Sequence, residues 1–122
     1  MRVGIPCVKS GERFYISPHF GRAPYFALYE VSEEGVKLVK IEENPHGTKE
    51  HRGGEGRLII DLLLKNGVEG VVVYGIGSGA FYRLRENGVK IFAVDKFMPV
   101  EEALELLRAG KLKEAEKPLE HD

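Results

Sequence analysis

Apolar side chains along this chain fall into short runs separated by glycine, proline and charged residues. Five of these runs are rich in β-branched and aromatic residues, a composition that favours extended strands. They cover residues 2–8, 25–31, 36–42, 68–74 and 89–94. The fourth run is apolar at almost every position, which is typical of a parallel strand covered on both faces. In the third run the alternation slips once, which indicates a β-bulge.

Three further segments repeat their apolar positions with helical spacing. They cover residues 57–66, 80–87 and 99–108. Gly67 is expected to close the first segment at its C′ position, and Gly88 and Gly110 are expected to end the other two. Ser78 is expected to cap the second helix, and Pro99 to open the third.

The order of these elements predicts the fold class. A hairpin comes first, and strands then alternate with helices, which indicates right-handed crossovers and parallel pairing. We therefore expect an α/β fold, a mixed sheet of about five strands with an antiparallel hairpin edge and a parallel βαβ part, flanked by helices. Pro6 in the first run removes a backbone donor, so that strand is expected at a sheet edge or with one unpaired position. Residues 1–110 are expected to form a single domain, and residues 111–122 a charged C-terminal tail, frayed or forming a short helix.

The composition of the chain limits the classes of partner that it is expected to bind. The 122 residues carry 18 basic and 19 acidic side chains, a net charge of −1, which argues against binding nucleic acid. No apolar run approaches the ~20 residues that cross a bilayer, and the first residues do not read as a signal peptide. The single cysteine, Cys7, excludes an internal disulfide and fits a reducing compartment, so we expect a cytoplasmic protein, monomeric or homodimeric.

Residues 17–23 form a short loop that brings together two reactive side chains. His19 can ligate a metal or carry a proton, and Arg22 can hold an anion through two parallel donors. Gly21 allows close approach of a ligand, Ser17 can bind local backbone N–H groups, and a proline stiffens each end. The loop is therefore a candidate binding site; the alternative is a tight turn whose histidine only caps neighbouring groups.

Two other glycine-rich segments carry candidate groups. His46 and His51 lie in a polar loop that could fold over His19 and form a three-histidine metal site, or remain a solvated loop. Residues 75–79 link a strand to a helix, so Gly75, Gly77 and Ser78 could hold an anion at the helix N-terminus. The same glycines equally allow close packing of strand and helix.

The cysteine count limits the cluster chemistry that is possible. Iron–sulfur clusters held by protein alone usually need several cysteines, so one thiol cannot hold a conventional cluster. A preformed cluster that brings its own sulfide needs fewer protein ligands, which suits a carrier. Cys7 itself, on the first strand, is interpreted as a small buried hydrophobe.

The Ser-Pro-His-Phe-Gly-Arg-Ala string, the Glu43-Asn44-Pro45 turn, the histidine–glycine stretch and the Gly75-Ile76-Gly77 turn occur here in one order. Together they resemble the dinitrogenase iron–molybdenum cofactor biosynthesis family, which includes NifX-like proteins, the C-terminal part of NifB and small stand-alone members. The resemblance covers about residues 1–110. It implies a ribonuclease-H-like α/β fold, the binding or carrying of iron–sulfur or iron–molybdenum clusters, and His19 as the family's loop histidine.

Three functions of different class follow. The first is a non-enzymatic carrier for an iron–molybdenum or other metal–sulfur cluster, or for a molybdenum-type oxyanion, that exchanges its cargo with donor and acceptor proteins. The second is a regulatory module that binds a nucleotide or phosphate at residues 75–79. The third, a metal-dependent nuclease, needs converging carboxylates, whereas Asp61 falls in a predicted helix and Asp95 follows the fifth strand.

Overall fold

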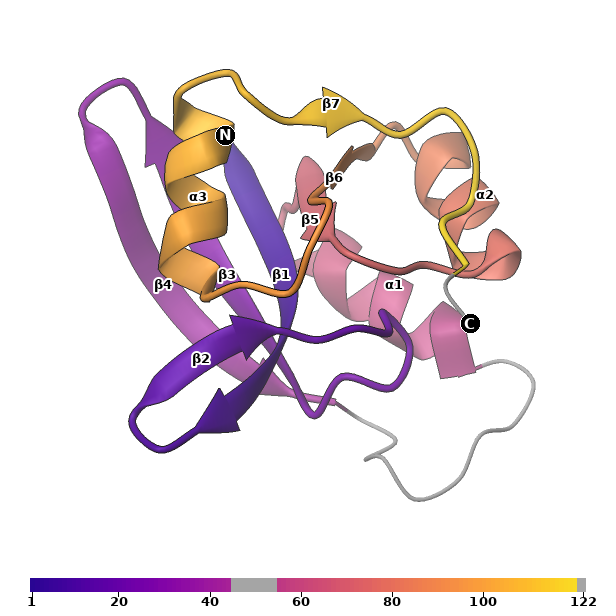
Figure 1. The fold of residues 1–122 in the computed structure, drawn as a ribbon. Helices are drawn as coiled ribbons and strands as arrows, with labels where there is room; N and C mark the ends of the chain where they lie inside the picture. Colours follow the sequence, from indigo (N-terminus) through magenta and orange to yellow (C-terminus); the bar gives the residue numbers. More distant parts are fainter. Residues whose placement is uncertain (45–54, 121–122) are drawn as a thin grey trace.

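The first strand lies at the centre of the sheet in the computed structural model, which describes residues 1–44 and 55–120. The elements in chain order are β1 (Arg2–Ser10), β2 (Arg13–Ile16), β3 (Tyr25–Ser32), β4 (Gly35–Glu43), α1 (Glu55–Lys65), β5 (Gly70–Val73), α2 (Ser78–Glu86), β6 (Lys90–Ala93), α3 (Val100–Arg108) and β7 (Lys113–Glu114) (Figure 1). The sheet has seven strands in the order β4-β3-β1-β5-β6-β7, with β2 paired to β1. The chain therefore forms the predicted mixed sheet flanked by helices, with two strands more than predicted.

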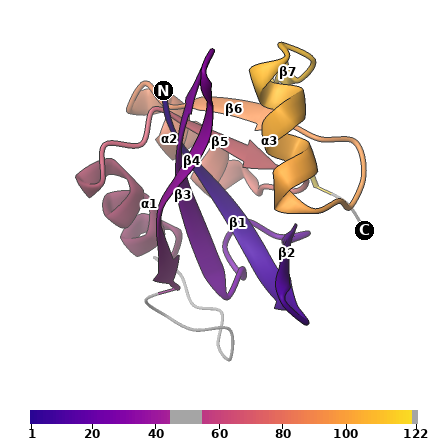
Figure 2. The same ribbon diagram turned by 90° about the vertical axis from the view of Figure 1, so that its left-hand side faces the viewer.

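Helices cover both faces of the sheet (Figure 2). On one face, Ile59 and Leu63 of α1 and Phe81 of α2 pack with sheet residues in one buried cluster. On the other face, Ala103 and Leu104 of α3 pack in a second cluster. Because both faces are covered, β5 is buried at every position, as its apolar run predicts. None of the helices in the described ranges is long and apolar enough to cross a membrane.

Of the two expectations for Pro6, the sheet edge is wrong and the single unpaired position in the strand is confirmed. On one side β1 pairs with β3 past Pro6, and on the other it pairs first with β5, at Val3 and Gly4, and then with β2 from Cys7 onward. Pro6 lies between these two partners, where its carbonyl accepts a 2.8 Å hydrogen bond from the Ser17 N–H. A proline is tolerated in this central strand because its missing N–H falls where β1 changes partner.

The end of the chain also differs from expectation. Residues 111–120 are neither a frayed tail nor a helix: β7 pairs antiparallel with β6, and Leu119 forms a bridge with Ile76. The apolar pattern gave no sign of this strand, because β7 has two exposed, charged residues and takes its place through backbone pairing. The bulge in the third run is confirmed, since the register moves from Leu28–Lys40 to Tyr29–Leu38.

The three helices end just before the glycines that were expected to terminate them. Gly67, Gly88 and Gly110 have φ values of 73°, 76° and 73°, so each ends its helix as predicted and does so in the left-handed conformation. The N-cap prediction for α2 is wrong by one residue: Gly77 is the cap, Ser78 is already helical, and no side chain caps this end. The first turn of α2 therefore begins with backbone N–H groups that no side chain satisfies.

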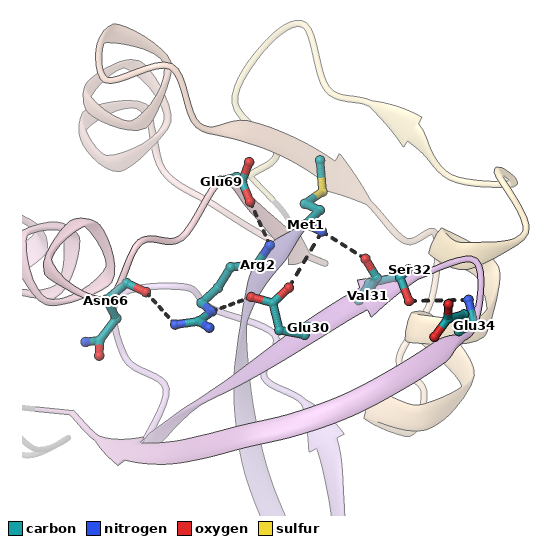
Figure 3. A network of polar contacts seen from close by, with 8 residues as sticks. All are labelled: Met1, Arg2, Glu30, Val31, Ser32, Glu34, Asn66 and Glu69. Carbon is teal, nitrogen blue, oxygen red and sulfur yellow. Dashed lines mark hydrogen bonds and ion pairs between the residues drawn. The ribbon is translucent and has the colours of Figure 1, made fainter.

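A polar network closes the amino end of β1 and β5 (Figure 3). Arg2 donates through Nε to Glu30 at 2.7 Å and through Nη1 to the Asn66 carbonyl at 3.2 Å. The Arg2 backbone N–H donates to Glu69 Oε1 at 2.9 Å. These contacts join β1, β3 and the segment between α1 and β5, at the opposite end of β5 from the glycine turn at residues 75–77.

Candidate functional site

The loop between β2 and β3 is held by its own serine. Ser17 is 3% exposed, and its hydroxyl donates to the His19 carbonyl at 3.0 Å and accepts from the His19 N–H at 3.3 Å. The local bonding expected of Ser17 is therefore present. It fixes the backbone on either side of Pro18, and it leaves the imidazole of His19 exposed.

Phe20 anchors the same loop from inside. Its ring is buried, 5.4 Å from the ring of Phe26 in an edge-on arrangement, and its N–H donates to the Gly75 carbonyl at 3.1 Å. Ala23 is buried as well, whereas Arg22 is exposed. Apolar residues thus point inward, and the two reactive side chains remain at the surface of the loop.

Asn44, at the end of β4, holds the second half of the loop. Its side-chain amide donates to the Gly21 carbonyl at 3.2 Å and to the Ala23 carbonyl at 2.9 Å. Its backbone N–H donates to the Pro24 carbonyl at 3.0 Å. The sequence indicated only a turn at Asn44 and not its bonds to the loop. The feature that could have indicated this role is the position of Asn44 directly before a proline at the end of a strand.

The glycine turn after β5 is braced by the end of the chain. Ile76 and Leu119 exchange two backbone hydrogen bonds, of 2.8 and 3.0 Å. This pairing brings Leu119 and Glu120 beside Gly77, from a segment more than forty residues away in the sequence. No local pattern indicated that these two residues belong to the site.

These segments enclose a cavity of about 260 Å³, lined by residues 19–22, 75–77 and 119–120. The structure thus brings together His19, Gly21, Arg22, Gly75 and Gly77. The remaining candidates are placed differently. Ser17 is buried behind the loop, Ser78 is exposed at the start of α2, and His46 and His51 lie outside the described residues.

The polar groups of the cavity are mostly cationic or donating. Arg22 lines it, and the N-terminus of α2, which carries the positive end of the helix dipole, begins beside it. The first helical bond of α2 is donated by Phe81 to the Gly77 carbonyl, so the N–H groups between them are free of helical partners. Glu120 supplies an opposing carboxylate. The arrangement suits an anion held by one imidazole, one guanidinium and backbone donors.

The described residues hold no ready-made metal centre. Within residues 1–44 and 55–120, no group of three or more His, Cys, Asp or Glu side chains comes together. The interpretation of Cys7 as a small buried hydrophobe is confirmed, because the side chain is fully buried in the cluster under α3. Burial raises the pKa of the Cys7 thiol to about 11, although a hydrogen bond with the Ala27 backbone partly offsets this. Burial therefore favours the protonated form of the Cys7 thiol and places it in the core of the protein.

Comparison with known proteins agrees with the resemblance that the motifs suggested. The family model described as dinitrogenase iron–molybdenum cofactor matches residues 1–110. The FeMo cofactor biosynthesis protein NifB of Sinorhizobium fredii is 32% identical over 104 residues, which are 83% of this chain and 20% of that protein. The chain thus spans about a fifth of the length of this NifB.

Solved structures share the fold over nearly the whole chain. A NifB-like protein from Thermotoga has a TM-score of 0.75 at 27% identity, over 99% of this chain and 98% of that one. The apo form of the orange protein of Desulfovibrio gigas has a TM-score of 0.80 at 22% identity, over 98% and 96%. The second likeness concerns the fold alone.

Proposed function

The chain belongs to the dinitrogenase iron–molybdenum cofactor family, and we propose that it binds and carries an anionic metal–sulfur cluster of the iron–molybdenum type in the cavity between residues 19–22 and 75–77. The observation that carries this proposal is the meeting of His19, Arg22 and the uncapped N-terminus of α2 around one cavity. In this role the protein binds the cluster and catalyses no reaction.

The ligand set favours a preformed cluster over one assembled on the protein. His19 can supply one imidazole nitrogen, and the single cysteine, Cys7, is buried in the core. A cluster that contains its own sulfide can be held by one such ligand together with charge. Arg22 and the N–H groups of α2 offset the negative charge of the guest, since charge-assisted hydrogen bonds are about twice as strong as neutral ones.

A carrier also has to release its cargo, and the cavity suits this. His19 and Arg22 are exposed, so a donor or acceptor protein could reach the guest without opening the core. A sulfide cluster survives in a reducing compartment, in agreement with a cytoplasmic location. The ribonuclease-H-like character of the fold remains a prediction.

The proposal is tested by anaerobic titration of the full chain with isolated iron–molybdenum cofactor, followed by visible absorption. We expect saturable binding that falls at least about tenfold in His19→Ala and severalfold in Arg22→Ala, as expected when a ligand or a charged hydrogen-bond partner is lost. Arg108→Ala is the matched control, because it removes a guanidinium that pairs with Glu105 away from the cavity. Equal affinity of the native protein and His19→Ala would contradict the proposal.

A phosphate-binding module is the second candidate, favoured by the uncapped N-terminus of α2 at the cavity. The same protein is titrated with ATP and with inorganic phosphate, and unfolding temperatures are compared. Stabilisation by ATP or phosphate without binding of the cofactor would favour this second function.

A further inference from the structure

A second cavity lies on the α3 side of the sheet, where β5 and β6 end. Its volume is about 780 Å³, within the ~300–1,000 Å³ of typical small-molecule sites. Tyr74 and Val94, which directly follow β5 and β6, both line it. Ligands of open α/β sheets bind outside the carboxyl ends of the strands, so the position alone makes this cavity a candidate site.

The walls of this cavity are largely apolar. Leu106 of α3 and Leu112, from the segment that leads to β7, both line it. Both leucines are only partly buried, although they pack against the same cluster as the fully buried residues under α3. Val94 and Met98, which are buried, also line the cavity. The cavity therefore offers apolar surface that the chain itself leaves uncovered.

Lysines dominate the charged part of the lining. Lys96, Lys111 and Lys113 line the cavity and are exposed, and none forms an ion pair with another residue in the described ranges. Asp95 and Glu102 also line it, so three positive charges stand against two negative ones. A guest with an apolar body and an anionic end would complement both parts.

We propose that this cavity binds a small amphiphilic carboxylate, with its apolar body against Leu106 and Leu112 and its carboxylate among the lysines. The site is separate from the His19 cavity, and Leu119 is the residue that lines both. The proposal does not depend on cluster binding, and its test needs no cluster.

Decanoate is the probe, added to the full chain and followed by amide NMR spectra. We expect saturable shifts at residues 93–96, 106 and 111–113, and weaker binding in Leu106→Lys, which places a charge in the apolar wall. Leu58→Lys is the matched control, because Leu58 is 47% exposed on α1, across the sheet. The spectral dispersion of each variant reports whether it is folded.

Charge reversal tests the anionic end separately. Lys111→Glu combined with Lys113→Glu should weaken decanoate binding by about threefold to tenfold, as expected for exposed ion pairs, and leave binding of neutral decanol unchanged. These exposed positions keep the test valid if Leu106→Lys does not fold. The proposal is overturned if decanoate shows no saturable shifts, if Leu58→Lys and Leu106→Lys weaken it equally, or if charge reversal has no effect.

Discussion

Asn44 offers the sharpest test of how the candidate site is held together. Replacing it with alanine removes two side-chain donors, at 3.2 and 2.9 Å, and leaves the Gly21 and Ala23 carbonyls without them. The bond to Ala23 is buried and the bond to Gly21 is partly buried. An unsatisfied buried carbonyl costs about 1–3 kcal/mol, whereas a carbonyl that water can reach costs about 0.5–1.5 kcal/mol. The two losses together predict a fall of about 1.5–4.5 kcal/mol in the free energy of unfolding.

Denaturant unfolding of the native protein and of Asn44→Ala measures this difference directly. Asn66→Ala is the matched control, because its amide makes one 2.8 Å bond, to the Leu62 carbonyl at the end of α1, and should cost about 1 kcal/mol. Amide exchange at Phe20, whose N–H donates to Gly75, should quicken in Asn44→Ala and not in Asn66→Ala. A loss in Asn44→Ala no larger than that in Asn66→Ala would refute the idea that Asn44 holds the loop.

Three further predictions follow from buried groups and special backbone positions. Because burial raises the pKa of Cys7 from 9.0 to about 11, the unfolded thiol releases its proton first as the pH rises, and stability should fall by about 2 kcal/mol between about pH 8 and about pH 10.5. Burial also raises the pKa of Tyr29, which acts in the same direction, so Cys7→Ala should reduce this pH dependence without abolishing it; an unchanged slope would contradict the reasoning. Gly67→Ala should cost about 1 kcal/mol because its φ is 73°, whereas Gly21→Ala, with open space at its Cβ position, should leave stability unchanged in thermal unfolding. Arg2→Ala should lower the unfolding temperature through loss of its bonds to Glu30 and Asn66, yet leave cofactor affinity as it is, since this network lies at the far end of β5.

The features of the fold that could be predicted are those determined by short-range patterns in the sequence. Gly67, Gly88 and Gly110 mark helix ends because the left-handed conformation is a local property of the backbone. The bulge opposite Leu28 and Tyr29 also shows in the alternation of a single strand. Such features need no knowledge of distant partners, and the sequence was sufficient for them.

The features that were missed depend on distant pairing. When β1 is considered alone, Pro6 allows either an edge strand or one unpaired position, and the choice between them follows only from the change of partner between β5 and β2. The residues of β7 are charged and therefore gave no hydrophobic signal. This strand is positioned by its backbone pairing with β6. Asn44 and Leu119 reach the site from far along the chain, so their roles emerge only once the sheet is assembled.

The measurement that addresses the central claim most directly is nitrogen-15 NMR of the histidine side chains, before and after anaerobic loading with iron–molybdenum cofactor. Binding in the proposed cavity predicts that the His19 imidazole signals shift or broaden beyond detection, together with the amides of residues 20–22 and 75–77, while those around Leu58 keep their positions. Loading that perturbs other regions and leaves the His19 imidazole unchanged would contradict the account.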